Sequence, residues 1–276
     1  MPIQELLNAR LRYELRGRGG DPTVLIHGSW VDHRTWDLVI PGLAQSLDVL
    51  SYDRRGHGES TGAPRTRPVA DDAADLGSLL EARDHFPAHV VAHSYGGAVA
   101  LELASERPEL VRSLVLHEPP FLGLLANDPA TASEGEFLLG ELHRLTRRAR
   151  SGDREGAIRG AVEAFTLEPG AWERLAPSLR DGFVRYAERW LEEVEDPMAL
   201  APERKLLSDL LVPALLTYGT QSPGFLRRIT EIVARELPNS AVQSIPDAGH
   251  VPHVTRPEQY VGLLLTFLVE RNVPVT

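Results

Sequence analysis

Short apolar segments alternate with longer segments of helical spacing along most of the chain. Short, β-branched apolar runs are typical of strands buried in a parallel sheet, and apolar residues three or four apart indicate helices. The predicted strands are residues 10–16, 23–27, 48–53, 89–92, 111–117, 213–218 and 241–245. The predicted helices are residues 36–47 and 69–83, with two more that start at Gly97 and near Pro257. This alternation predicts an α/β fold with a doubly wound, mostly parallel sheet.

One long segment departs from the alternation. From about residue 133 to residue 195 the spacing is helical throughout, and no strand is predicted there. The expected helices lie near residues 134–150, 153–166 and 178–195. A crossover of this length would be unusual. We therefore expect residues 121–207 to form a helical cap (lid), over the carboxyl edge of a sheet domain made of residues 1–120 and 208–276.

The stretch HVVAHSYGGAVALELA, residues 89–104, places a serine between a predicted strand and a predicted helix. Ala92 and Gly96, two residues before and after Ser94, are small enough for a very tight turn. Such a turn would raise the Ser94 hydroxyl above the sheet edge, with the Tyr95 amide at a helix N-terminus that favours anions. The stretch predicts a nucleophile elbow, although an ordinary turn serine would also fit this window.

The composition restricts the partners and the compartment. The formal net charge of −10 argues against a nucleic acid or an anionic membrane as partner. The chain has no cysteine, which excludes disulfides, thiol catalysis and cysteine-ligated metals. No apolar run suits a secretory signal or a membrane span, so we expect a cytoplasmic protein, of undetermined oligomeric state.

Four motifs follow one another, each at the end of a predicted strand: His27-Gly28-Ser29-Trp30, DRRGHGES at residues 53–60, Ala92-His93-Ser94-Tyr95-Gly96-Gly97 and Asp247-Ala248-Gly249-His250. In this order the motifs resemble those of the α/β-hydrolase superfamily. The resemblance implies that Ser94 is the nucleophile and His250 the general base. It also implies an oxyanion hole made by the amides of Ser29 and Tyr95. His27 and His57 are expected to shape their loops.

The acid of the implied catalytic triad is not at its commonest family position, which here holds Ser222. No carboxylate occurs between Asp209 and Glu231. A branch of the superfamily, similar to zearalenone-type lactonases, places its acid directly after the strand that follows the elbow, where this chain has Glu118. Glu118 is therefore the expected acid, although it could be an ordinary strand-end glutamate. Asp247 is a weaker rival, since an aspartate there is more naturally a turn residue.

A Ser–His–Glu site with two amide donors suits acyl transfer to water. We expect a serine esterase or lactonase that acts on a small, largely apolar substrate, with Trp30, His253 and Phe121 as candidate pocket residues. The same triad could instead cleave a carbon–carbon bond or a thioester, or carry out perhydrolysis. A ligand receptor of the same fold with little turnover is another possibility. No zinc spacing or glycine-rich phosphate loop is evident, so no metal or cofactor is expected.

Overall fold

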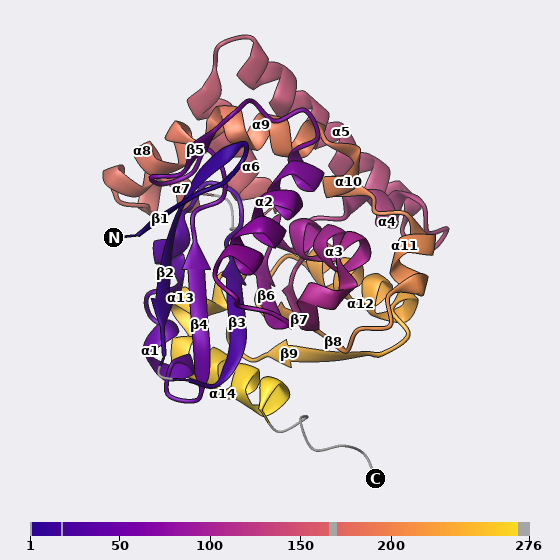
Figure 1. Ribbon diagram of the computed structural model, residues 1–276. Coiled ribbons are helices and arrows are strands. Elements are labelled where there is room, and N and C mark those ends of the chain that lie inside the picture. Colours follow the sequence, from indigo (N-terminus) through magenta and orange to yellow (C-terminus); the bar gives the residue numbers. More distant parts are fainter. Residues whose placement is uncertain (1, 18, 166–169, 270–276) are drawn as a thin grey trace.

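The computed structural model describes residues 2–17, 19–165 and 170–269, and a single twisted sheet forms its centre (Figure 1). Its strands are β1 (Ile3–Glu5), β2 (Ala9–Arg16), β3 (Asp21–Ile26), β4 (Leu47–Tyr52), β5 (Thr61–Gly62), β6 (Ala88–His93), β7 (Val111–His117), β8 (Ala214–Gly219) and β9 (Ser240–Ile245). Their spatial order is β1-β2-β4-β3-β6-β7-β8-β9, with β5 paired to β2. Pairing is parallel from β4 to β9 and antiparallel around β2. The expected doubly wound, mostly parallel sheet is confirmed.

Helices cover both faces of this sheet. Successive residues of a strand point to opposite faces, so a strand with consecutive apolar residues gives each face an apolar surface that helices bury. Leu25 and Val91 belong to the apolar layer on one face, and their neighbours Val24 and Val90 belong to the layer on the other. The first layer includes α1 (Ile40–Leu43) and α14 (Pro257–Leu268), and the second includes α2 (Pro68–Ala82), α3 (Gly96–Glu106) and α12 (Gly224–Glu236). Burial on both faces explains why the inner strands β6, β7 and β8 are mostly apolar.

The helical insertion lies between β7 and β8. Its helices are α4 (Leu122–Ala126), α5 (Ala132–Arg150), α6 (Arg154–Phe165), α7 (Ala171–Arg174), α8 (Pro177–Arg185), α9 (Ala187–Glu195), α10 (Pro197–Leu200) and α11 (Arg204–Asp209). Figure 1 shows α5, α6, α8 and α9 at one end of the molecule, toward which the arrow of β4 points. The insertion therefore lies over the carboxyl edge of the sheet.

Two predicted helices differ from the observed ones. The segment predicted as a helix over 36–47 contains only a 3₁₀ turn (His33–Trp36) and the short α1. Pro41 explains the difference: it has no amide to donate, so it is tolerated only in the first turn of a helix, and α1 begins beside it. The segment predicted over 178–195 is divided at Tyr186, whose hydroxyl accepts a hydrogen bond from the Gly58 amide at 3.0 Å.

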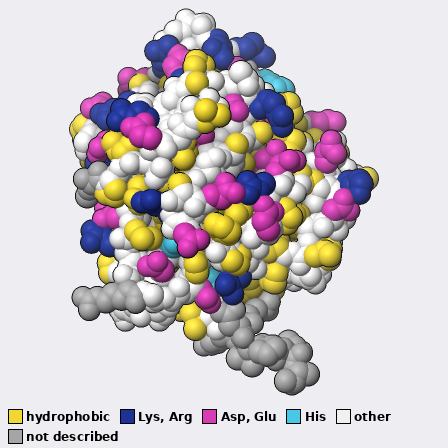
Figure 2. Space-filling model, viewed as in Figure 1, with side chains coloured by type: hydrophobic (Ala, Val, Ile, Leu, Met, Phe, Trp, Pro, Cys, Tyr) yellow, Lys and Arg dark blue, Asp and Glu magenta, His cyan; other side chains and the backbone are white. Residues whose placement is uncertain are grey.

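The surface carries charges of both signs. On the face shown in Figure 2, acidic and basic side chains are interspersed with apolar ones. Exposed ion pairs of the described residues include Arg150 with Glu195 and Lys205 with Asp209. Among the helices of the described residues, none has the length and apolarity needed to cross a membrane.

Candidate active site

Ser94 occupies the sharp turn between β6 and α3. Its backbone lies in the left-handed region, at φ 53°, which is rare for a residue with a side chain. The Ser94 amide donates a hydrogen bond to the carbonyl of His117 on the neighbouring strand, at 2.9 Å. Gly96 is required, because a Cβ there would lie 2.7 Å from the carbonyl oxygen of Ile26. These contacts fix Ser94 in the geometry of a nucleophile elbow.

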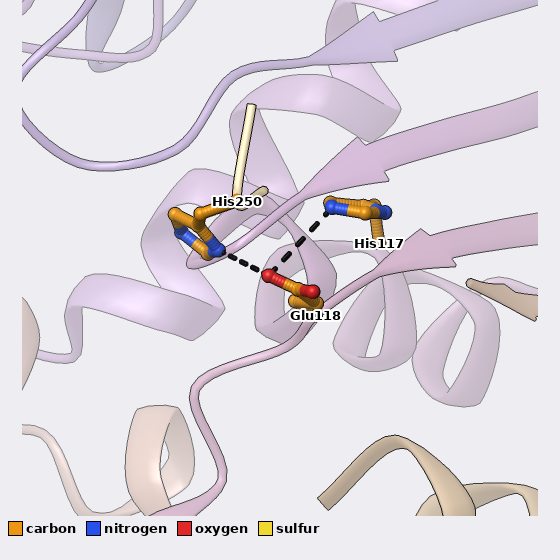
Figure 3. Close-up of side chains that lie close together, drawn as sticks. All are labelled: His117, Glu118 and His250. Atoms are coloured by element: carbon orange, nitrogen blue, oxygen red, sulfur yellow. Dashed lines mark hydrogen bonds and ion pairs between the residues drawn. The ribbon is translucent and has the colours of Figure 1, made fainter. Parts of the chain in front are cut away.

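Glu118 and His250 meet at the carboxyl edge of the sheet, although they are far apart in the sequence (Figure 3). Nδ1 of His250 donates a hydrogen bond of 2.7 Å to Oε2 of Glu118. The other carboxylate oxygen accepts a hydrogen bond of 2.8 Å from the amide of Gly219. Because an ionised carboxylate only accepts, Nδ1 carries the ring proton and Nε2 remains available as a base. His250 and Ser94 line the same cavity.

The Glu118 carboxyl is completely buried yet ionised at neutral pH. Burial alone would raise its pKa, but the adjacent imidazoles of His117 and His250 lower the pKa to about 2. Nε2 of His117 lies 3.7 Å from Oε2 of Glu118. Figure 3 shows that both rings approach this same oxygen. The hydroxyl of Ser222 also lowers the pKa of Glu118, although it lies outside hydrogen-bond geometry. The site therefore holds a fixed negative charge behind the imidazole of His250.

Three further histidines surround His250. The ring of His93 lies 4.6 Å from that of His250 and 4.7 Å from that of His253, centroid to centroid. Burial lowers the pKa of His93 and His253 well below the usual range and that of His117 to about 4. Nε2 of His93 donates a hydrogen bond to the carbonyl oxygen of His250 at 2.7 Å. These neutral rings place no competing positive charge beside His250.

The two alternative positions for an acid are occupied differently. Ser222 follows β8, and its buried hydroxyl has no hydrogen-bond partner among the described residues. Asp247 is exposed, with a left-handed backbone at φ 54°, and its amide donates to the Thr220 hydroxyl at 3.0 Å. Asp247 is thus a turn residue, and Glu118 is the carboxylate that contacts His250.

The residues expected to form the oxyanion hole lie beside Ser94. Tyr95 immediately precedes α3, so its amide lies at the N-terminus of an 11-residue helix. Ser29 follows His27 and Gly28 after β3, and both Ser29 and Tyr95 line the cavity that contains Ser94. Nε2 of His27 accepts a hydrogen bond from the Arg54 amide at 3.0 Å, so this ring supports the loop. The placement suits stabilisation of an oxyanion by two backbone amides.

This geometry agrees with a comparison of the sequence with known families. Residues 23–263 match the alpha/beta hydrolase family. The chain belongs to this family. The family expected from the four motifs is therefore confirmed.

Relatives of this hydrolase have several activities. The chain is 30% identical over 266 residues to a dihydrolipoyllysine-residue acetyltransferase component of an acetoin cleaving system from Pseudomonas putida, with coverage of 93% of this chain and 65% of that protein. It is 29% identical over 248 residues to a pimeloyl-acyl-carrier-protein methyl ester esterase from Neisseria meningitidis, with coverage of 88% and 91%. The solved enol-lactonase from Burkholderia xenovorans matches with a TM-score of 0.75 at 20% identity, over 97% of this chain and 99% of that chain. The structural match shows the shared fold.

The cavity of this hydrolase that contains Ser94, Glu118 and His250 measures about 730 Å³. Its wall is mostly apolar and includes the aromatic residues Trp30, Tyr95, Phe165, Phe183, Tyr186 and Trp190, with Phe225 from α12. The ring of Trp30 lies 5.9 Å from that of Trp190 and 6.0 Å from that of Phe183. The cavity is large enough for a small acyl or aryl substrate.

The other two candidate pocket residues lie elsewhere. Phe121, at the start of the insertion, is fully buried in the larger apolar cluster and is not among the residues that line the cavity. His253 is also fully buried; its Nε2 lies 2.8 Å from the Thr35 hydroxyl, and its ring lies 4.5 Å from that of Trp36. Phe121 follows Glu118 and His253 follows His250 by three residues, but burial behind neighbouring side chains keeps both from the cavity.

Two residues that the sequence did not single out complete the site. Arg54, inside the DRRGHGES motif, donates hydrogen bonds to the carbonyls of His27 at 3.2 Å and Gly28 at 3.0 Å. Glu193, on α9, accepts hydrogen bonds from Arg54 at 2.7 Å and from the Ser29 hydroxyl at 2.5 Å. The motif pointed to Arg54 only as part of a loop, and helical spacing gave no signal for Glu193.

Two groups of side chains among the described residues have the composition of a metal site. They are His117 with Glu118 and His250, and Asp32 with His33 and Asp53; within each group the ligand atoms lie within 4.8 Å of one another. In the second group, Nδ1 of His33 donates to Asp53 at 2.5 Å, and Asp32 is paired with Arg34. This group borders a second cavity of about 840 Å³, which Ser94 does not line, although Asp32 lines both cavities.

Proposed function

We propose that this hydrolase cleaves a carboxylic ester or a lactone of a small, largely apolar substrate through an acyl-enzyme on Ser94. The observation that carries the proposal is the 2.7 Å hydrogen bond between Nδ1 of His250 and ionised Glu118, in the cavity that Ser94 on its nucleophile elbow also lines. The apolar cavity supports an acyl or aryl group as the part of the substrate held beside Ser94. The Neisseria methyl ester esterase and the Burkholderia enol-lactonase, by their names, act on bonds of this class.

In the proposed reaction, Nε2 of His250 takes the hydroxyl proton of Ser94 while the serine oxygen bonds to the carbonyl carbon. The carbonyl oxygen becomes negative and accepts hydrogen bonds from the amides of Ser29 and Tyr95. Collapse of this intermediate breaks the ester bond, and the leaving alcohol takes the proton from His250. A water molecule then repeats the sequence, which releases the acid and restores Ser94. Glu118 stabilises the imidazolium in both halves.

We further propose that residues 121–207 act as a cap that determines which acyl groups enter. The support is that side chains of α8 and α9, such as Phe183 and Trp190, form the wall opposite the strand ends. Phe183→Ala should therefore shift the preference toward bulkier acyl chains while p-nitrophenyl acetate is still cleaved. The measurement is kcat/KM across p-nitrophenyl esters of increasing chain length; an unchanged preference would contradict this role.

The function is tested with p-nitrophenyl esters and a panel of lactones, using wild type, Ser94→Ala and Ser178→Ala. Ser178 lies on α8 in the wall of the same cavity and is the matched control serine. We expect turnover by wild type and Ser178→Ala, and a loss of about three orders of magnitude or more in Ser94→Ala. If wild type neither turns over any substrate nor reacts with a serine-directed phosphonate, a ligand receptor is the better description.

A further inference from the structure

Glu193 is a completely buried carboxylate that the insertion places against the loop after β3. It lies on α9 and lines the same cavity as Ser94. Both of its oxygens are engaged: Oε2 accepts from the Ser29 hydroxyl at 2.5 Å, and Oε1 accepts from Arg54 at 2.7 Å. A carboxylate loses much hydration on burial and needs such partners, so their presence indicates a specific arrangement.

Arg54 touches both halves of the proposed oxyanion hole. Its guanidinium donates to the carbonyls of His27 and Gly28, the two residues before Ser29. It also lies over the ring of Tyr95, 4.4 Å from the centroid. A further partner, Asp72 on α2, accepts a hydrogen bond from Arg54 at 2.7 Å. One buried guanidinium therefore contacts the loop on one side, the elbow on the other, and the insertion through Glu193.

We infer that Glu193 and Arg54 are a positioning pair that holds the Ser29 amide in the orientation the oxyanion requires. This inference rests on the proposed function, and it gives the insertion, through Glu193, a part in forming the oxyanion hole. The residue after Ser29, Trp30, has a left-handed backbone at φ 63°, which persists only where surrounding contacts hold it. The hydrogen bond from the Ser29 hydroxyl to Glu193 supplies such a contact, and it also leaves the Ser29 amide, rather than the hydroxyl, to face the oxyanion.

Whether a substitution at Glu193 speeds or slows the reaction distinguishes this positioning role from a purely electrostatic one. A carboxylate near a developing oxyanion opposes it by charge repulsion, so neutralising Glu193 would speed the reaction if charge alone mattered. If Glu193 positions the loop, neutralising it weakens the contacts to Arg54 and Ser29, and the reaction slows. Small displacements of catalytic groups are enough for a large loss in rate.

The test compares Glu193→Gln, Ser29→Ala and the double variant with the control Glu192→Gln. Glu192 is the adjacent residue of α9, and it pairs with Arg65 and Arg189 rather than with the loop. We expect kcat of Glu193→Gln to fall by about 10- to 100-fold with little change in KM. The reason is that the oxyanion forms in the transition state and is absent from the bound substrate. Affinity for a boronic-acid transition-state analogue should fall in parallel. Ser29→Ala should have a similar effect, the double variant should be less than additive, and Glu192→Gln should resemble wild type.

A second measurement does not depend on activity. Hydrogen exchange of the segment 27–32 should be faster in Glu193→Gln than in wild type and unchanged in Glu192→Gln. Unchanged exchange, or a kcat that stays level or rises in Glu193→Gln, would overturn the positioning role. If wild type lacks esterase and lactonase activity, the proposed function fails, and the exchange comparison still decides whether Glu193 holds the loop.

Discussion

Two buried glutamates face one cavity from different parts of the molecule. Glu118 lies in the sheet domain, where an imidazole and a backbone amide hold its carboxylate. Glu193 lies on a helix of the insertion, where an arginine and a hydroxyl hold its carboxylate. The first contacts the side chain of the proposed base, and the second contacts the loop of a proposed oxyanion donor. The comparison teaches that the role of a buried carboxylate in such a cavity follows from the group to which it is hydrogen-bonded.

The largest expected effect comes from removing the charge of Glu118. Glu118→Gln should lower kcat by two to four orders of magnitude, because the imidazolium of His250 loses its counter-charge and its tautomer is no longer fixed. The measurement is steady-state hydrolysis of the best p-nitrophenyl ester. Asp247→Asn, which alters the exposed turn carboxylate near His250, is the control and should stay active. If Glu118→Gln stays active and Asp247→Asn loses activity, Asp247 rather than Glu118 is the acid of the triad.

The commonest acid position after β8, which holds Ser222, offers a second test of the assignment of Glu118. Ser222 lies near Glu118, so an aspartate at 222 would bring a carboxylate close to His250. We expect Ser222→Asp, in the Glu118→Gln background, to recover about tenfold of the lost kcat. The same change in wild type should not raise activity, because two adjacent carboxylates repel.

Removing Arg54 should lower stability as well as disturb the Ser29 loop. Arg54→Met leaves the buried carboxylate of Glu193 without its charged partner and leaves Asp72 with Arg65 alone, so we expect a loss of about 3–5 kcal/mol in the free energy of unfolding. Urea denaturation monitored by tryptophan fluorescence gives this value. Arg107→Met, which removes only exposed ion pairs, should change stability little. Equal losses of unfolding free energy in the two variants would mean that the buried ion pairs of Arg54 contribute no more to stability than exposed ones.

The ionisation of Glu118 should also appear in the acid dependence of stability. Its pKa is about 2 in the folded state against 4.5 for a free glutamate, so protons bind more readily to the unfolded chain. The stabilisation is complete above about pH 4.5 and is lost as the pH falls toward 2, a contribution on the order of 3 kcal/mol. Unfolding free energies of wild type and Glu118→Gln should therefore converge as the pH falls. Curves that stay parallel from neutral pH to pH 3 would contradict this.

The smallest expected effect is that of metal removal. Because the proposed chemistry uses only side chains and backbone amides, exhaustive treatment with EDTA should leave kcat unchanged. The measurement is ester hydrolysis before and after chelation, with added zinc as a second arm. A loss that zinc restores would assign one of the two His–carboxylate groups to a metal, and His33→Ala would show which one.

Features set by local sequence could be predicted, whereas those set by packing could not. The inner strands are mostly apolar because both sheet faces are covered there, so their positions followed from the residues. Glu118 could be proposed because it ends a strand and Ser222 occupies the usual acid position. The predicted helix over 36–47 was wrong in extent because Pro41 limits where a helix begins. Glu193 could not be found, since its direction depends on how α9 packs against Arg54.

The most direct test is the rate at which a p-nitrophenyl phosphonate labels the protein, followed by mass spectrometry of the peptide that carries the label. The account predicts one label, on Ser94, and a labelling rate at least about 100-fold slower in Glu118→Gln, because the attack requires a charge-stabilised imidazole. Labelling at another residue, or an unchanged rate in Glu118→Gln, would contradict it.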